Sequence, residues 1–170
     1  MNDKTDASAD ALASSTWLAV VRAYQTCNRR YEELLALHGL SAAQFDTMDA
    51  VHRLGADALP KRIAETLLVT RGNVTGLLRR LEKAGLLRLQ AHESDGRSRV
   101  ARLTEVGRRL HREALRSTRA FVRAQLAPFS REDLDQTHAT MNTMHFHLLG
   151  LDVAAIHQAA QQAHEKESWT

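Results

Sequence analysis

The apolar pattern between residues 59 and 103 changes twice, and this limits the fold more than any other feature of the chain. Leu59-Pro60 predicts a helix start, because a proline in the first turn has no N–H to leave unpaired. Thr70 follows a short break and is a typical N-cap for a second helix, which Gly85 ends. From the next residue onward, apolar and polar side chains alternate as they do in β-strands.

A hairpin is predicted after these two helices. Asp95-Gly96 is the strongest short turn signal in the chain, and it separates alternating segments at 86–91 and 99–103. Two short helices joined by a tight turn outline a helix-turn-helix. With the hairpin added, the predicted fold class is mainly α with a small β-hairpin wing, a winged helix-turn-helix.

The N-terminal part is predicted to be a tail followed by helices. Residues 1–10 are expected to be flexible, and a long helix is expected from 11 to about 38. Gly39 lies where a left-handed C-cap belongs. Ser41 and Gln44 have the spacing of a capping box, which predicts the start of the next helix.

The C-terminal part is predicted to form two long helices. Thr104 caps one that runs to about Leu126 and is stopped by Pro128, and Ser130 starts a last helix that continues to roughly His164. The middle unit is too small to cover the apolar faces of all the long helices, so these faces need another surface to pack against.

Composition excludes several classes of protein. The chain has 8 Gly and 2 Pro among 170 residues, too few turn residues for a typical all-β fold. A single cysteine excludes an intramolecular disulfide and a Cys-rich zinc site. No apolar run is long enough to span a membrane, and the N-terminus lacks the apolar core of a secretory signal. We therefore expect a cytoplasmic protein without a membrane partner.

Positive charge is concentrated in the middle of the sequence. Residues 60–110 hold twelve Lys and Arg against five Asp and Glu, whereas residues 1–59 and 111–170 each carry a net negative charge. This distribution is typical of a local polyanion-binding face. A solvated helix surface is an equally good explanation of the charge alone.

The predicted helix 70–84 has two distinct faces. At 100° per residue one face is apolar, and it holds Val74, Leu77, Leu78 and Leu81. The opposite face holds Gly72, Gly76, Arg79 and Lys83. Each exposed helical glycine costs about 1 kcal/mol relative to Ala, which close approach of a nucleic acid would compensate. The alternative is a surface helix with incidental glycines.

The hairpin tip, residues 94–99, carries Arg97 and Arg99. Arginines on a two-stranded ribbon suit insertion into a narrow minor groove. In isolation such a tip is more often a solvated turn, and its position after the helix 70–84 is what favours DNA binding. Asp95 is suited to capping the turn or orienting Arg97.

The sequence resembles the MarR (multiple antibiotic resistance regulator) family. The resemblance covers about residues 40–108 in unbroken order, and its combination of motifs is highly specific. The segments that carry it are Leu40–Phe45 (LSAAQF), Ile63–Glu65 (IAE), Val69–Thr75 (VTRGNVT), Arg80–Leu86 (RLEKAGL), Asp95–Ser98 (DGRS) and Leu103–Arg108 (LTEVGR).

The resemblance implies a bacterial or archaeal transcriptional regulator, expected to be a repressor, and neither an enzyme nor a cofactor-dependent protein. Residues 40–104 would form the DNA-binding unit. Residues 11–39 and 105–165 would form interlocking dimerisation helices of an obligate homodimer. The dimer would bind a pseudo-palindrome in double-stranded DNA, with half-sites on the order of 10 bp apart.

The resemblance also implies roles for individual residues. Those expected to face the major groove are Thr70, Arg71, Asn73, Thr75 and Arg79, with Arg97 in the minor groove and Lys61, Arg80 and Arg99 on phosphates. The expected effector is a small phenolic or other aromatic acid. The candidate residues for binding it are Trp17, Arg22, Tyr24, Phe45, Asp46, Asp49 and His52. Trp17 would supply stacking and Arg22 a partner for a carboxylate. Dimer core and surface is the alternative explanation for each of them singly.

Two other sensing chemistries are less favoured. Cys27 lies too near Ser41 for the peroxide-sensing position of the family, although Arg29 and Arg30 are suited to lowering the pKa of its thiol. Five histidines fall in the last predicted helix, but none is four residues from another, the spacing that most readily shares a metal. They are His138, His145, His147, His157 and His164. No metal site is therefore expected.

Two functions outside DNA-binding regulation remain as alternatives. One is a helical interaction protein that keeps the fold without binding DNA, against which the basic middle segment argues. The other is a hydrolytic enzyme, against which the sequence offers no nucleophile motif, no HExxH and no Gly-rich phosphate loop.

Overall fold

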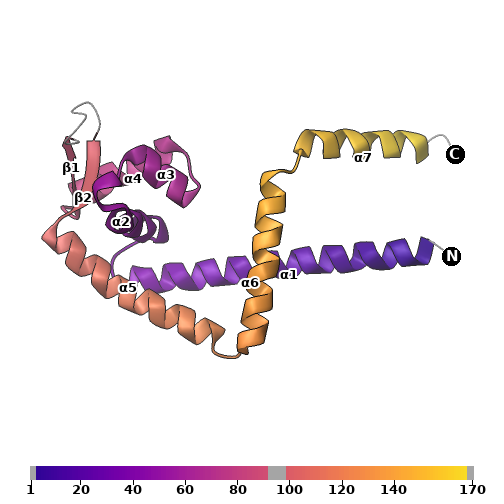
Figure 1. The fold of residues 1–170 in the computed structure, drawn as a ribbon, viewed down its shortest axis with the longest axis horizontal. Coiled ribbons are helices and arrows are strands. Elements are labelled where there is room, and N and C mark those ends of the chain that lie inside the picture. The colour runs from indigo at the N-terminus through magenta and orange to yellow at the C-terminus, as the bar shows by residue number, and fades with distance from the viewer. Residues whose placement is uncertain (1–2, 92–98, 168–170) are drawn as a thin grey trace. The chain divides into compact units, whose positions relative to one another are not determined.

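The computed structural model describes residues 3–91 and 99–167 (Figure 1). Its described part is helical apart from one antiparallel hairpin, which confirms the predicted fold class. The chain divides into two compact units, residues 1–124 and 125–170, and each is described separately. No helix of the described residues is both long enough and apolar enough to cross a membrane.

The first helix, α1 (Asp3–Ala36), begins earlier than expected. Residues 3–10 are helical, so the predicted helix start at residue 11 is wrong. The stretch is rich in Ala and Asp and holds no Gly or Pro, a composition that suits a helix N-terminus. The helix ends at Ala36, and the turn that follows it closes at Gly39 in the predicted left-handed conformation, with φ +69°. The amide of Leu40 donates to the carbonyl of Leu35 at 3.1 Å, as in a Schellman motif.

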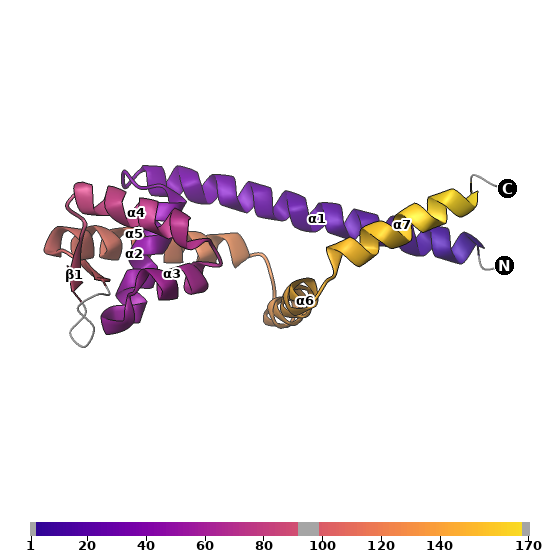
Figure 2. The ribbon, with the colours of Figure 1, turned by 90° about the horizontal axis from the view of Figure 1, so that it is seen from above.

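Helix α2 (Ala42–Leu54) starts at the predicted capping box. The Ser41 hydroxyl accepts from the amide of Gln44 at 3.2 Å, and the Gln44 side chain accepts from the Ser41 amide at 2.9 Å. The C-terminal end of α1 contacts α2, around which the other elements of the first unit gather (Figure 2).

A short 3₁₀ helix, η1 (Gly55–Asp57), leads into α3 (Pro60–Leu67), which has Pro60 in its first turn as predicted. Leu68 ends α3 in the left-handed conformation, with φ +55°. This residue and Val69 make the tight turn into α4 (Arg71–Lys83), which Thr70 caps. The helix-turn-helix is therefore present over the predicted residues.

Strands β1 (Leu87–Ala91) and β2 (Arg99–Leu103) pair antiparallel, with Leu87 opposite Leu103. Strand β2 contacts α2, α3 and η1, and the Ala101 amide donates to the carbonyl of Ala58 at 2.9 Å. The turn expected at Asp95-Gly96 lies outside the described residues.

The core of this unit draws on α1 to α4 and the hairpin. Its largest fully buried apolar side chains are Leu35, Met48, Ile63, Leu78, Leu81, Leu87 and Val74. Helix α5 (Glu105–Leu126) follows directly, and the Thr104 hydroxyl accepts from the amide of Gly107 at 3.0 Å. A Cβ at Gly107 would lie 1.9 Å from the carbonyl oxygen of Leu86. Glycine at this position therefore permits α5 to start against the base of β1.

The second unit holds α6 (Arg131–Leu149) and α7 (Val153–Glu167). The single helix expected from Ser130 to about His164 is thus wrong, because it is interrupted at residues 150–152. Asp152 accepts hydrogen bonds from the amides of Ala154 and Ala155, both at 3.0 Å, and so caps a new helix. None of the residues 125–163 is buried, and several apolar side chains are exposed, among them Phe146, Leu149 and Val153.

Candidate nucleic-acid interface and ligand clefts

Helix α4 presents the two faces that its sequence predicts. Val74, Leu77, Leu78 and Leu81 are buried, and the residues between them are exposed. A Cβ added at Gly76 would meet nothing within 4 Å, and one at Gly72 would meet only the Thr70 hydroxyl oxygen at 4.0 Å. Packing against the described residues therefore does not require these two glycines. Glycine destabilises a helix relative to alanine, and no packing contact among the described residues compensates for that cost.

The polar side chains at the start of α4 differ in how far they are already engaged. The Thr70 hydroxyl accepts from the amide of Asn73 at 3.4 Å, and the Thr75 hydroxyl donates to the carbonyl of Arg71 at 2.9 Å. Arg71, Arg79 and Arg80 are exposed and form no ion pair with any described residue. Among the described residues, no carboxylate lies within salt-bridge distance of their guanidinium groups.

The remaining predicted DNA contacts surround this helix. Lys61 is exposed on α3, with its ammonium nitrogen 3.8 Å from a Glu65 carboxylate oxygen, a loose surface pair of little strength. Arg99 is exposed on β2 and donates to the carbonyl of Leu89 at 3.3 Å. Arg97 lies outside the described residues, so the structure does not place it.

Two further arginines extend the basic surface of the hairpin. Arg88 and Arg102 are directly opposite each other in the strand register, and both are exposed. Like charges at opposed positions destabilise a strand pair. From the sequence alone, Arg88 and Arg102 are polar positions in the alternating strands and are not predicted DNA contacts.

One cleft of about 440 Å³ lies in the first unit beside α5, and we call it the α5 cleft. Its lining is largely apolar, with one carboxylate and two guanidinium groups. The residues that line it are Tyr31, Phe45, Asp49, Leu115, Thr118, Arg119, Val122 and Arg123. The combination suits a flat apolar ligand that carries a negative charge.

Two residues of this lining, Tyr31 and Phe45, belong to a chain of aromatic and polar contacts. His111 is 1% exposed, and its ring stacks on Phe45 with centroids 5.7 Å apart. Tyr31 meets Phe45 edge-on at 6.3 Å, and its hydroxyl donates to Asp46 at 3.1 Å. Burial raises the pKa of the Tyr31 hydroxyl. These contacts hold the aromatic rings in fixed positions.

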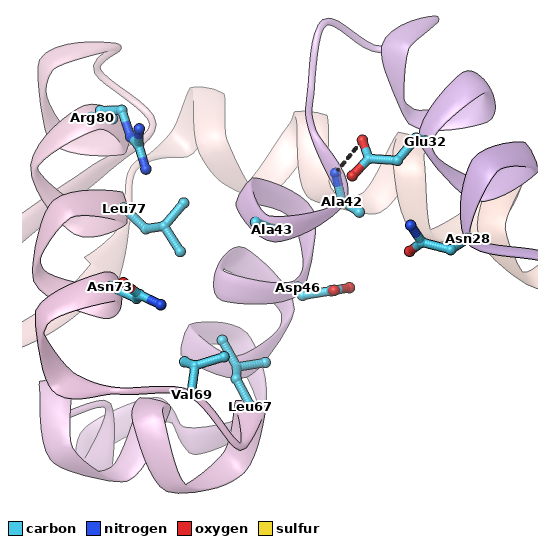
Figure 3. Close-up of a pocket in the computed structure, with 10 residues that line it drawn as sticks. All are labelled: Asn28, Glu32, Ala42, Ala43, Asp46, Leu67, Val69, Asn73, Leu77 and Arg80. Atoms are coloured by element: carbon cyan, nitrogen blue, oxygen red, sulfur yellow. Dashed lines mark hydrogen bonds between the residues drawn. The ribbon is translucent and has the colours of Figure 1, made fainter. Parts of the chain in front are cut away.

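A second cleft of about 440 Å³ lies between α4 and the junction of α1 with α2, and we call it the α4 cleft (Figure 3). Helix α4 contributes Asn73, Leu77 and Arg80, and the α3–α4 turn contributes Leu67 and Val69. The opposite wall consists of Asn28, Glu32, Ala42, Ala43 and Asp46. A third cleft, of about 150 Å³, includes His52, Arg102 and Arg108.

Four of the seven predicted effector residues line one of the three clefts, and the other three do not. Phe45 and Asp49 line the α5 cleft, Asp46 lines the α4 cleft and His52 the small third cleft. Trp17, Arg22 and Tyr24 are exposed on α1 and line none of these three clefts; the exposed fractions of Trp17 and Tyr24 are 58% and 69%.

Sequence reasoning missed several residues of the α5 cleft, among them Tyr31, Arg119 and Arg123. The two arginines are four residues apart on α5, which is also the spacing of any solvated helix face. The sequence also does not indicate that His111 is buried, because Arg109 and Arg112 lie close to it in the chain.

The comparisons with known proteins agree with this geometry. The family model described as MarR family matches residues 38–98. The transcriptional activatory protein BadR of Rhodopseudomonas palustris is 30% identical over 154 residues, which are 87% of this chain and 85% of BadR.

Two solved structures share the fold at low sequence identity. CouR from Rhodococcus jostii RHA1, solved with p-coumaroyl-CoA, has a TM-score of 0.70 and 20% identity, covering 78% of this chain and 93% of CouR. MepR of S. aureus, solved as a DNA complex, has a TM-score of 0.69 and 21% identity, covering 78% of this chain and 95% of MepR.

Proposed function

Because the chain belongs to the MarR family of transcriptional regulators, we propose that it is a ligand-responsive repressor. In this proposal a homodimer binds a pseudo-palindromic operator on double-stranded DNA in the cytoplasm. A small aromatic or phenolic acid then releases it from the operator. The single observation that carries the DNA-binding part is the exposed face of α4, which combines two glycines without a packing role and arginines that form no ion pair with the described residues.

The residue roles in the major groove follow from side-chain chemistry. Arg71 can pair bidentately with guanine and Asn73 with adenine. Gly72 and Gly76 let the helix backbone approach the groove, while Arg80 and Lys61 neutralise phosphates. MepR, which shares the fold, was solved in complex with DNA, and this supports the assignment.

Exposed apolar side chains support the homodimer. Leu12, Trp17 and Leu18 of α1 are 68%, 58% and 41% exposed. Phe146 and Leu149 of the second unit are each 69% exposed. Large apolar surfaces of this kind mark interaction sites in soluble proteins. A second copy of the chain would cover them in the proposed dimer.

The α5 cleft is the proposed effector site. An aromatic ring would pack against Phe45 and Leu115, and a carboxylate would pair with Arg119 or Arg123. CouR, which shares the fold, was solved with p-coumaroyl-CoA. The contact between His111 of α5 and Asp49 of α2 joins the helix beside this cleft to the first helix of the proposed DNA-binding unit.

A release assay tests this proposal. A fluorescent duplex recovered by affinity selection from genomic DNA is titrated with protein, with and without a panel of benzoic and cinnamic acids. We expect at least one acid to release the duplex, and Arg119→Gln to reduce that release while leaving duplex affinity unchanged. Arg112→Gln, an exposed control on the same helix outside the cleft lining, should behave as wild type. Release unaffected by Arg119→Gln and by Arg123→Gln would remove the α5 cleft from the proposal.

A reporter gene behind the recovered operator tests the sign of regulation. We expect expression to rise when the protein is absent. A fall in expression would make the protein an activator, as the name of BadR describes that relative.

A further inference from the structure

We propose that the α4 cleft is a second ligand site, separate from the α5 cleft, and that it takes a small amphipathic cation such as an arylalkylammonium ion. The binding part of this inference does not depend on the proposed function. Its regulatory consequence does, because it rests on the proposed DNA contacts of Asn73 and Arg80.

The cleft has a negatively charged end built by α1 and α2. Figure 3 shows Asp46 extending from α2 toward Asn28 of α1, with Glu32 one turn further along α1. Both carboxylates are held in place through one oxygen. Glu32 Oε2 accepts from the Ala42 amide at 3.0 Å, and Asp46 Oδ1 accepts from the Tyr31 hydroxyl at 3.1 Å.

The other oxygens of these two carboxylates are open to a ligand. Glu32 Oε1 and Asp46 Oδ2 form no hydrogen bond with any described residue, and neither carboxylate has a Lys, Arg or His partner within salt-bridge distance there. Burial raises the pKa of Asp46, and the charges of Asp49 and Glu32 raise it further, against the lowering effects of the Tyr31 hydrogen bond and the Arg53 charge. A ligand cation between Glu32 and Asp46 would relieve this repulsion.

The middle of the cleft is apolar and suits a ring or an alkyl chain. Leu77 is 9% exposed and forms the floor on α4, whereas Val69 is 41% exposed at the α3–α4 turn. Leu67 and Ala43 complete this part of the lining. The total volume of about 440 Å³ is within the range of small-molecule sites.

The far end of the cleft sets the orientation of the ligand. Asn73 and Arg80 extend from α4 toward α2 (Figure 3). The Arg80 guanidinium repels a second positive charge, so the ligand charge belongs beside Asp46 and its ring beside Leu77. The α5 cleft has the opposite preference, because Arg119 and Arg123 line it. The two clefts therefore select ligands of opposite charge.

A ligand in the α4 cleft would act directly on DNA binding. Asn73 and Arg80 line the cleft and are also residues that we propose to contact the duplex. Ligand and duplex would therefore compete for the same side chains, with no relay through α5. An effector in the α5 cleft, by contrast, contacts none of the proposed DNA-binding residues.

Two probes of equal shape and opposite charge test the site. Tryptamine and indole-3-propionate share an indole ring and a two-carbon linker, but one ends in an ammonium group and the other in a carboxylate. Each is titrated by calorimetry into the full-length protein without DNA. We expect Asp46→Asn and Glu32→Gln each to weaken tryptamine binding about tenfold or more, since each removes a charged partner.

Controls separate the site from general charge effects and from misfolding. Glu33→Gln changes the exposed neighbour of Glu32, which pairs with Arg30 outside the cleft, and should leave tryptamine affinity unchanged. Arg119→Gln should weaken only indole-3-propionate. Asp46→Asn can still accept the Tyr31 hydrogen bond, and an unchanged thermal unfolding midpoint confirms that it folds.

The outcomes are distinguishable from those of the proposed function. Failure of tryptamine to bind at millimolar concentration, or equal binding by wild type and both carboxylate variants, overturns the site whatever the protein does with DNA. If tryptamine binds in the expected way, it should also raise the apparent dissociation constant of a bound duplex. Binding without that competition would overturn the regulatory consequence while the site stands.

Discussion

His111 of α5 and Asp49 of α2 are joined by a 3.0 Å contact between Nε2 and Oδ1. The histidine is 1% exposed, and the same carboxylate binds Arg53 through its other oxygen at 2.9 Å. This contact ties α5, which borders the proposed effector cleft, to the first helix of the proposed DNA-binding unit. Removing a partner from a hydrogen bond to a charged group costs about 1.5–3 kcal/mol when the remaining group stays buried.

The contact predicts a pH dependence of stability. The hydrogen bond from His111 holds the pKa of the Asp49 carboxyl below its ordinary value of 3.8. The ionised carboxylate therefore stabilises the folded chain above that value, and this contribution is lost as the pH falls through the lowered pKa. Asp49→Asn should reduce the free energy of unfolding at neutral pH by about 1 kcal/mol, less than loss of the whole hydrogen bond, because the amide oxygen can still accept from His111.

Urea unfolding at neutral pH and at about pH 3 checks this expectation. The difference between wild type and Asp49→Asn should shrink at the acidic pH. The exposed Asp57 provides a control, and Asp57→Asn should show no such change. A constant difference at both pH values would mean that Asp49 stabilises the fold for reasons other than its charge.

Gly107 is predicted to be intolerant of a side chain. In Gly107→Ala the added Cβ would lie 1.9 Å from the Leu86 carbonyl oxygen, and because this is a backbone atom, α5 must move away from the strand. We expect a loss of at least about 2 kcal/mol in unfolding free energy. Gly76→Ala is the matched control, because the same added carbon meets nothing within 4 Å. A small effect at both positions would show that α5 does not approach the hairpin as closely as described.

The exposed glycines of α4 predict a conflict between stability and DNA binding. Gly72→Ala and Gly76→Ala should each raise the free energy of unfolding by about 0.5–1 kcal/mol, because alanine is the better helix former. Both should weaken duplex binding if the helix backbone approaches the groove. Denaturation and fluorescence anisotropy on the same protein preparations measure the two effects. Gain of stability with unchanged affinity would place the groove contact on another face.

Arg71 and Arg80 are predicted to contribute to DNA binding in different ways. Arg71→Ala should cost about 1–3 kcal/mol and relax the preference for one base. Arg80→Ala should weaken all duplexes about equally and reduce the slope of log affinity against log salt by about one. Titrations of a selected duplex and its single-base variants at two salt concentrations separate the two effects. Equal losses with unchanged base preference for both variants would show that Arg71 contacts phosphate instead.

The elements defined by local signals could be predicted, whereas those that depend on distant contacts could not. Caps at Ser41 and Thr70 and the proline at residue 60 act within one helical turn, so the sequence locates them correctly. The break at Gly150 was missed because apolar residues continue on both sides of it. The predicted start of α1 is too late because an acidic, Ala-containing stretch also resembles a disordered tail.

The residues that line the candidate clefts could not be predicted for the same reason, because they are brought together by distant contacts. Residue type alone favours Trp17 and Tyr24, but neither lines a described cleft, because α1 leaves both exposed. The contact between Asp49 and His111 joins residues 62 positions apart, and no periodicity in either helix indicates that they meet. The face of α4, in contrast, follows from its own apolar spacing and needs no distant contact.

We propose that two copies of this chain use α4 to bind one symmetric stretch of DNA. Selection of genomic fragments by the full-length protein at low salt, followed by sequencing, is the decisive experiment. We expect enriched fragments that share a two-fold symmetric sequence with half-sites on the order of 10 bp apart, and loss of that enrichment with Arg71→Ala. A folded protein that enriches no sequence over bulk DNA would contradict it.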